Sequence, residues 1–335
     1  MRGMRRAGQL PLAVAVVVLL ALVVLALSLG DLALGPVVLA RTLVGAGDAT
    51  AELVLFRLRL PRVVVGVLVG VGFGIAGAIF QAVLRNPLAS PDVLGISGGA
   101  SVAAVTAMLV LGWTGPAVSA AALVGAAAAA AAIAGLAWRD GIVGYRFVLI
   151  GVAIAMLVNA VLGYVLTRAD VRGVADALVW MVGSTASVRW REIALVAGAT
   201  AVVLPAVALA RRSLSVLQLG DDLARGLGVR VDRQRLVLLG AAVALVAVGT
   251  AVVGPIAFVA FVAAPIARRL LGAGSTALAL AGAVGAVIVT AADVVGQHLL
   301  PGGVQVPVGI VTGLVGAPYL LWLLATANRT AGEAS

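Results

Sequence analysis

Few side chains of this sequence could take part in chemistry, and their types exclude most catalytic designs. All 23 basic residues are arginine, so the chain lacks both the lysine of a phosphate-binding P-loop and a lysine for Schiff-base formation. It has no cysteine and one histidine, His298, which excludes zinc clusters, thiol catalysis and two-histidine metal sites. We therefore expect no enzyme, no metal centre and no cofactor, and any ATP hydrolysis must occur on another polypeptide.

One glycine motif could suggest nucleotide binding. Residues 72–77 read Gly-Phe-Gly-Ile-Ala-Gly, which matches the G-x-G-x-x-G pattern that holds a dinucleotide between a strand and a helix. That context is missing, because the motif lies inside a long apolar run. Small residues recur at every fourth position, at Gly66, Gly70, Gly74 and Ala78, and such a face lets a second membrane helix approach closely. We interpret the motif as a helix-packing surface.

The composition predicts that lipid surrounds most of the chain. Hydrophobic residues make up 63% of the 335 residues, charged residues make up 11%, and the mean hydropathy is +1.21. A helix needs roughly 20 apolar residues to cross a membrane, and about ten such runs occur. We predict an all-α polytopic membrane protein with one domain over residues 1–335. The expected helices are 10–29, 60–84, 95–112, 116–137, 146–167, 191–210, 236–251, 253–271, 275–296 and 306–326.

The arginines predict how the chain is oriented. They account for the net charge of +10, but they lie at the ends of apolar runs, where they fix topology, so nucleic acid is not an expected partner. The run at 10–29 is longer than the roughly 7 to 15 residues of a signal peptide, which favours a retained helix. With an even number of crossings and most arginines on the inner side, we expect an inner-membrane protein with both termini in the cytoplasm.

A polar break interrupts the apolar sequence after the second predicted helix. Asn86 and Pro87 open it, a second proline follows at Pro91, and the break leads into Ser97 and Gly98. Irregular backbone at membrane depth is tolerated only where protein buries it or where it borders a water-filled path. We expect these residues to line or gate a pathway, and the alternative is a simple connecting loop.

The longest predicted cytoplasmic loop covers residues 218–235 and has an ordered charge pattern. Asp221 and Asp222 come first and arginines follow, an order that suits the dipole of a short helix. Leu223 and Leu227 lie four positions apart, so they would form an apolar ridge that a partner groove could accept. A solvated loop is the alternative interpretation.

Two ionisable residues near the outer end of the ninth predicted helix also need an explanation. A charged group inside a membrane helix is costly, which makes Asp293 a functional candidate. A structural hydrogen bond to a neighbouring helix and a role in transport are equally good explanations for it. His298 is expected in the external loop, without a specific role.

Several of these segments together resemble the permease family of iron-siderophore and cobalamin ABC importers. The resemblance begins with Arg-Leu-Pro-Arg at 59–62, Asn-Pro-Leu-Ala at 86–89 and Gly-Ile-Ser-Gly-Gly-Ala at 95–100. It continues in the same order along the chain and covers roughly residues 10–326. The further matching segments are 77–81, 180–184, 219–228, 254–259, 267–268, 292–293, 307–313 and 316–318.

The resemblance implies a transport complex of several chains. Two permease copies, or this chain and a related permease, would enclose a path, with two cytoplasmic ABC ATPases and an extracytoplasmic substrate-binding protein as further partners. Arginines at the positions of Arg59 and Arg62 would receive the binding protein, although they could also simply anchor their helix at the interface. The segment that couples to the ATPase would contain Gly220, Asp221, Ala224, Leu227 and Gly228.

The resemblance also implies a substrate class. Gln305 replaces a glutamate common before the last helix, and with the segments at 307–312 and 316–319 this favours an iron-siderophore complex as the ligand. The alternatives are a cobalamin or haem importer permease or, with less support, a secondary transporter driven by an ion gradient. A proton-coupled carrier would be expected to have several buried carboxylates, and Asp293 is the one candidate.

Overall fold

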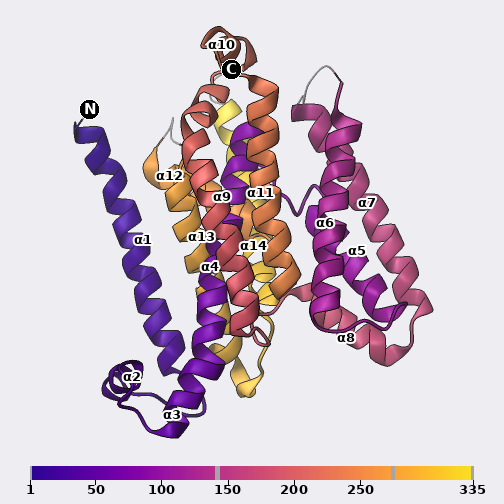
Figure 1. The fold of residues 1–335 in the computed structure, drawn as a ribbon. Coiled ribbons are helices and arrows are strands. Elements are labelled where there is room, and N and C mark those ends of the chain that lie inside the picture. Colours follow the sequence, from indigo (N-terminus) through magenta and orange to yellow (C-terminus); the bar gives the residue numbers. More distant parts are fainter. Residues whose placement is uncertain (1, 140–143, 273–275, 333–335) are drawn as a thin grey trace.

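The computed structural model describes residues 2–139, 144–272 and 276–332, and this part of the chain is helical without strands. Long helices run side by side between two ends of one bundle (Figure 1). Seven helical segments in the described ranges are long and apolar enough to cross a membrane. The lengthwise helices are α1 (Arg2–Ser28), α4 (Leu60–Val83), α5 (Ile96–Leu109), α6 (Pro116–Ala137), α7 (Gly144–Arg168), α9 (Trp190–Leu217), α11 (Val231–Val253), α12 (Val259–Leu271), α13 (Leu278–Val294) and α14 (Val308–Gly332).

These helices confirm the predicted fold class, and each predicted span covers most of one of them, with boundaries that differ by several residues. Short helices that we did not predict lie at one end of the bundle: α2 (Pro36–Leu43), α3 (Ala49–Leu53) and α8 (Val171–Val182) (Figure 1). They escaped prediction because they are too short, or too polar on one face, to give a membrane-length apolar run. At the other end lies α10 (Asp221–Gly226), the short helix expected in the 218–235 loop.

Helix α4 is the centre of the fold, and its glycines determine how close its neighbours come. A Cβ on Gly70 would lie 2.6 Å from the Cα of Ala286, and a Cβ on Gly74 would lie 2.0 Å from the carbonyl oxygen of Ala281. Since real side-chain carbons cannot approach so closely, α13 can pack here only against glycine. The packing interpretation of the glycine motif is confirmed.

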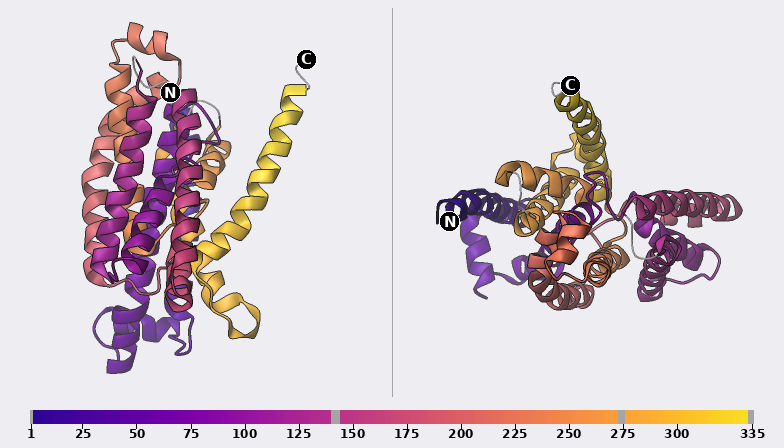
Figure 2. Two further views of the ribbon diagram at one scale, coloured as in Figure 1. Left: turned by 90° about the vertical axis from the view of Figure 1, so that its right-hand side faces the viewer. Right: turned by 90° about the horizontal axis from the view of Figure 1, so that it is seen from above.

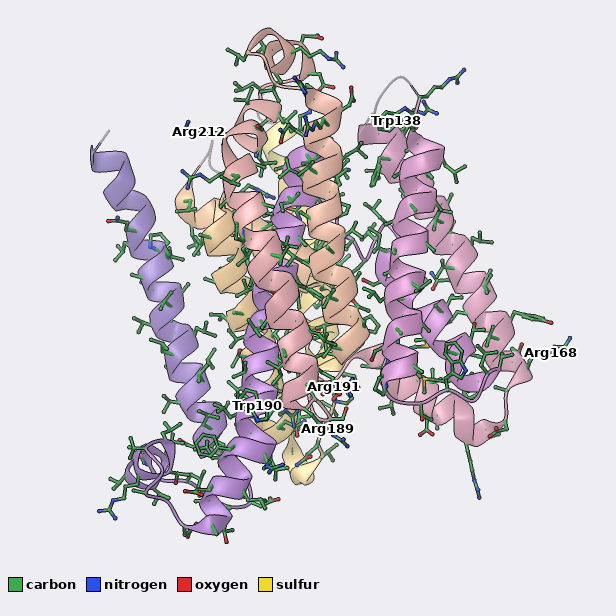
Figure 3. All side chains as sticks on the ribbon, viewed as in Figure 1. Trp138, Arg168, Arg189, Trp190, Arg191 and Arg212 are labelled. Atoms are coloured by element: carbon green, nitrogen blue, oxygen red, sulfur yellow. The ribbon has the colours of Figure 1, made fainter. Side chains whose placement is uncertain are left out.

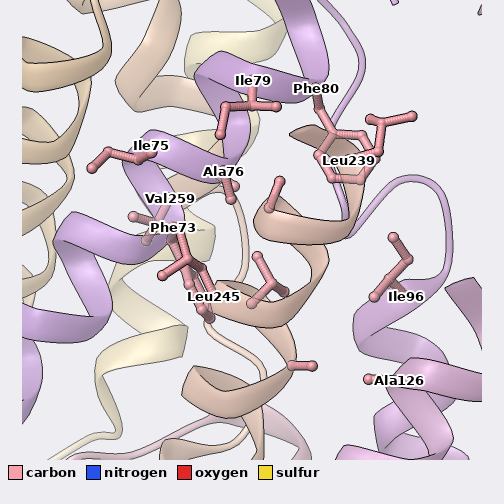
Figure 4. Close-up of a cluster of buried hydrophobic side chains, with 14 of the residues drawn as sticks. Phe73, Ile75, Ala76, Ile79, Phe80, Ile96, Ala126, Leu239, Leu245 and Val259 are labelled. Atoms are coloured by element: carbon pink, nitrogen blue, oxygen red, sulfur yellow. The ribbon is translucent and has the colours of Figure 1, made fainter. Parts of the chain in front are cut away.

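An adjacent face of α4 carries large side chains into the main hydrophobic core. Phe73 and Phe80 are almost fully buried and pack among residues of α11 that include Leu239 and Leu245 (Figure 4). The rings of Phe80 and Phe147 lie 6.4 Å apart, which joins α7 to the same core. Helix α4 therefore uses glycine for close backbone contact on one face and bulky residues for core packing on another.

Two crossings of the bundle are part helix and part irregular backbone. The linker 84–95 precedes the short helix α5, and the non-helical segment 254–258 precedes the short helix α12. The prediction of one continuous helix over 253–271 was therefore wrong. Pro255 lacks a backbone N–H, and Phe258 adopts a φ of 66° as α12 begins, so the helical hydrogen-bond ladder cannot continue through this segment.

The chain enters and leaves the bundle at the same end. The start of α1 and the end of α14 lie at the end that carries α10, as the views of Figures 1 and 2 agree. This arrangement fits the even number of crossings that we predicted. Helix α14 leans away from the rest of the bundle (Figure 2), and Leu314, Val315 and Leu321 on it are exposed apolar residues.

Candidate functional site

At the end opposite α10, Arg62 forms an ion pair inside the chain. Its Nε atom donates to the two carboxylate oxygens of Asp293 at 3.1 and 2.8 Å, and Nη2 donates to Oδ1 at 2.7 Å. The Thr185 hydroxyl donates to the same Oδ1 at 2.8 Å. The Arg62 and Asp293 side chains are only 18% and 11% exposed. The pair therefore ties the start of α4 to the end of α13 and to the segment after α8.

Arg59 is also bound within the chain. Its Nη1 donates to the carbonyl oxygen of Leu27 at 2.8 Å, and its Nη2 donates to that of Leu32 at 2.6 Å. These carbonyls lie at or just after the C-terminal end of α1, where helical acceptors lack partners and attract a cation. The geometry of Arg59 and Arg62 favours the anchoring interpretation over docking, and a docking role for either residue stays a prediction.

At the other end, the predicted coupling residues build one compact turn. Gly220, with a φ of 112°, precedes α10, and Gly228, with a φ of 81°, follows it. The Gly228 N–H donates to the Arg225 carbonyl at 2.9 Å, and the Val229 N–H donates to the Ala224 carbonyl at 2.9 Å. Together these bonds form a Schellman motif, in which glycine adopts the left-handed conformation that ends a helix. The glycines at 220 and 228 are therefore explained by backbone conformation.

Asp221 connects this turn to two long helices. Its Oδ1 accepts from Arg85 Nη2 at 2.7 Å and from Arg235 Nη2 at 2.8 Å. Arg85 follows the end of α4, whereas Arg235 lies in the first turns of α11 with a side chain only 4% exposed. Sequence reasoning missed both arginines as partners, because each is separated from Asp221 along the chain and only the fold brings the three together.

The outer face of α10 is apolar and exposed. Leu223 is 61% exposed, and Leu227, which directly follows α10, is 65% exposed, as expected for the predicted ridge. Leu219, which precedes Gly220, is 59% exposed. Ala224 on the opposite face is fully buried. A pair of exposed leucines four residues apart on a short helix and its C-cap is an apolar surface that a partner groove could accept.

The four predicted pathway residues fall into two places. Asn86 and Pro87 lie just after Arg85 at the α10 end, where the Asn86 side chain accepts from the Leu88 N–H at 2.9 Å and forms a turn. Ser97 and Gly98 lie in the first turn of α5. The Ser97 hydroxyl donates to Asp92 Oδ1 at 2.5 Å, and a Cβ on Gly98 would lie 2.9 Å from Val158 of α7.

The linker between these two places is largely covered by the rest of the chain. Ala89, Ser90 and Leu94 are buried, which satisfies the requirement that irregular backbone at membrane depth be covered. Whether the same residues border a path stays a prediction.

Three segments that are distant in the sequence meet at glycines. A Cβ on Gly183 would lie 2.4 Å from the Pro255 carbonyl oxygen, and one on Gly309 would lie 1.6 Å from the Val182 carbonyl oxygen. The Ser184 N–H donates to the Val253 carbonyl at 2.7 Å. The ends of α8 and α11 and the start of α14 are thereby fixed to one another.

A cavity of about 730 Å³ opens beside this junction, at the end opposite α10. Most of its lining is apolar and comes from the turns of α6, α8, α9 and α11 at this end. Three charged side chains also line it: Asp176, Arg191 and Glu192. Sequence reasoning did not find this cavity, because its walls come from five separate helices, α5 included through Met108, and from the loops between them.

Comparison with known proteins identifies the family. The sequence pattern of the FecCD transport family matches residues 18–326. This chain belongs to the FecCD transport family. The ferric enterobactin transport system permease protein FepG of Escherichia coli (strain K12) is 38% identical, with 86% of this chain and 87% of FepG covered. The achromobactin transport system permease protein CbrC of Dickeya dadantii (strain 3937) is 40% identical, with 92% and 89% covered.

The fold is also shared with a solved structure. An ABC transporter assigned to the metal-chelate type, in an inward-facing conformation, superimposes with a TM-score of 0.82 and is 24% identical. The alignment covers 94% of this chain and 98% of that chain. The predicted resemblance is confirmed, and the FecCD chain is a multi-pass membrane permease and not an enzyme.

Proposed function

We propose that this chain is the permease subunit of an ABC importer that carries an iron(III) chelate of the siderophore type into the cytoplasm. The observation that carries the proposal is the family match over residues 18–326, together with relatives named for ferric enterobactin and achromobactin. ATP hydrolysis belongs to a separate cytoplasmic ATPase, because this chain has no lysine for a P-loop. The partners are that ATPase, an extracytoplasmic substrate-binding protein and a second permease chain.

Helix α10 is proposed to receive the motion of the ATPase. Its exposed leucine ridge enters a groove of the ATPase, and its buried side rests on the bundle. Asp221 then transmits displacement of α10 to Arg85 after α4 and to Arg235 on α11. Since α4 packs at the centre of the fold, a small movement of α10 reaches the helices around any central path.

The path is proposed to lie against a second permease chain. Helix α14 leans out of the bundle and carries exposed apolar residues, as do α7 and α8, so these faces require lipid or another chain to cover them. We keep Asn86, Pro87, Ser97 and Gly98 as candidate gate residues, because they flank the irregular linker. A chelate needs a wide path that binds it weakly, so no metal-ligating cluster is required along it.

The orientation follows from these assignments. The α10 end faces the cytoplasm with both termini, and the opposite end faces outward and receives the binding protein. This orientation also places most arginines inside, in accordance with the positive-inside rule. It predicts that the cavity beside α8 opens on the outer side of the membrane.

Uptake tests the proposed function. Cells that contain this chain, its ATPase and its binding protein are supplied with radiolabelled ferric catecholate, ferric hydroxamate, ferric citrate or cobalamin. We expect uptake of an iron chelate that stops when the ATPase is inactivated and continues when ion gradients are collapsed. Uptake of cobalamin alone would instead support the second candidate function, which a 34% identical cobalamin import permease of Halobacterium salinarum (strain ATCC 700922 / JCM 11081 / NRC-1) favours. Uptake that depends on an ion gradient would contradict both.

A further inference from the structure

Charged side chains at the end opposite α10 divide into groups with and without a partner. Three carboxylates at this end bind backbone N–H groups of the chain itself: Asp48 accepts from the Ala51 N–H, Asp170 caps α8, and Glu192 accepts from the Arg189 N–H. The guanidinium groups of Arg59 and Arg62 are bound internally, as described above. Six further arginines at this end form no ion pair within the described chain. Arg41, Arg168 and Arg172 lie on or at the ends of α2, α7 and α8, whereas Arg57, Arg189 and Arg191 lie near the starts of α4 and α9.

Arg57, Arg189 and Arg191 are the direct chain neighbours of Phe56 and Trp190, which a hydrogen bond joins. A π-helical turn, Val54–Arg59, precedes α4 and directs the Leu60 N–H to the Leu55 carbonyl, and Pro61 has no N–H to donate. The Phe56 carbonyl consequently has neither its α-helical nor its π-helical partner. The Trp190 indole N–H donates to it at 3.0 Å.

The indole bond leaves the ring of Trp190 available. The residue remains 45% exposed, at the first position of α9 between two arginines. We name Arg57, Arg189, Trp190 and Arg191 the Arg-Trp patch. Figure 3 shows its α9 members close together at the base of α9 and next to α4, whereas Arg168 lies at the far flank of the molecule.

The patch adjoins the opening of the cavity. Arg191 lines that cavity, and it follows Trp190 directly in the chain. A soluble protein that delivers a ligand to this end would cover both the patch and the opening. Lipid headgroups would instead meet the flank, where Arg168 packs on the Tyr164 ring at 5.5 Å.

We propose that the Arg-Trp patch is the surface on which an acidic face of the extracytoplasmic binding protein docks. The inference rests on the proposed function and assigns docking to residues other than Arg59 and Arg62. Tryptophan and arginine are the residue types that most often dominate binding at protein interfaces, and unpaired cations attract an acidic partner at long range. Trp190 supplies a fixed aromatic contact, because its indole bond has already ordered the side chain.

The test measures binding of the cognate binding protein, loaded with its chelate, to the complex of permease and ATPase in nanodiscs. The variant Arg189→Glu plus Arg191→Glu should slow association at least about tenfold at low ionic strength and less at about 0.15 M salt. Arg189→Lys plus Arg191→Lys keeps the charge and should stay within about threefold of wild type. Arg168→Glu is the matched control for a reversed charge elsewhere at this end, and it should change association by less than about twofold.

Three other results of this binding experiment would contradict the proposed docking surface or the proposed function. If wild type binds and the double reversal binds equally well, the patch is not the docking surface and the proposed function stands. If wild type binds no loaded binding protein, the proposed function fails, and the patch assignment fails with it. If the double reversal loses only co-purified anionic phospholipid, the patch recognises headgroups. Monodisperse elution and an unchanged unfolding temperature establish that the variants are folded. Trp190→Phe removes the indole N–H without changing any charge, and it should weaken binding of the binding protein.

Discussion

Arg62 and Asp293 are 231 positions apart in the sequence and form a two-pronged ion pair, with the closest nitrogen and oxygen 2.7 Å apart. Helices α4 and α13 also pack glycine against backbone along much of their length. The ion pair fixes their register at one end, since a shift of either helix along its axis would break both prongs. Thr185 adds the segment after α8 to the same carboxylate.

Removal of one partner of this pair should destabilise the protein more than removal of both. Asp293→Leu leaves a largely buried guanidinium without its carboxylate, whereas Arg62→Met plus Asp293→Leu leaves neither charge. We expect a coupling energy of about 1–3 kcal/mol in a double-mutant cycle on thermal unfolding in detergent. A coupling energy near zero would mean that Arg62 and Asp293 do not interact in the protein in detergent, and Arg62 would again be a docking candidate.

The glycine face of α4 should not accept even one methyl group. Gly74→Ala would place a carbon 2.0 Å from the Ala281 carbonyl oxygen, so α13 must move, and we expect a loss of about 1–3 kcal/mol. Gly135→Ala on α6 is the matched control, because a Cβ there has no neighbour within 4 Å. Thermal unfolding should show Gly135→Ala at or above wild-type stability, since alanine favours helix. Equal behaviour of the two variants would contradict the packing account.

The contact between α10 and the bundle should depend on one of two adjacent aspartates. Asp221→Asn removes the charge that holds Arg85 and Arg235, whereas Asp222→Asn alters only a 3.8 Å pair with Arg225 at a fully exposed carboxylate. Amide hydrogen exchange over 221–226 should become about tenfold faster in Asp221→Asn and stay unchanged in Asp222→Asn. Faster exchange in both variants would show that general helix-dipole effects, not the specific bridge, hold α10.

The leucine ridge of α10 should determine assembly with the ATPase. Leu223→Ser plus Leu227→Ser removes apolar surface that is exposed in this chain, so the fold should persist while the Kd for the ATPase rises at least about tenfold. Val171→Ser, at an 87% exposed position on α8, is the matched control at the opposite end. Undiminished co-purification of the ATPase with the double variant would contradict the coupling assignment.

The absence of cysteine makes the orientation directly testable. Single cysteines at Thr114 and at Leu227 would be the only thiols of the chain and lie on exposed residues at opposite ends. A membrane-impermeant maleimide added to intact spheroplasts should label Thr114→Cys, and should label Leu227→Cys only after the membrane is opened. The reverse pattern would place α10 outside and remove the proposed coupling role.

Composition and spacing were sufficient for the fold class and for most helices. Lipid solvation demands long apolar runs, and these are visible in the sequence without any knowledge of neighbours. The small residues from Gly66 to Ala78 likewise predicted a close helix contact, because their period is a property of one helix. The Asp-first, Arg-last order at 221–235 predicted α10 by the same local logic.

Local reasoning failed where the outcome depends on segments that meet only in three dimensions. The non-helical segment 254–258 packs against Gly183. Its residues are apolar like those of the neighbouring helices, so hydropathy alone could not distinguish this segment from a helix.

The partners of charged groups were decided in the same way. The sequence predicted that Arg59, Arg62, Arg189 and Arg191 lie at one end of a membrane protein, whereas only the tertiary structure showed that Arg59 bonds to backbone carbonyls and that Arg62 pairs with Asp293. The partner of a charged side chain is the opposite charge or acceptor that the fold places next to it. For Arg62 this is the carboxylate of Asp293, which is far away along the chain.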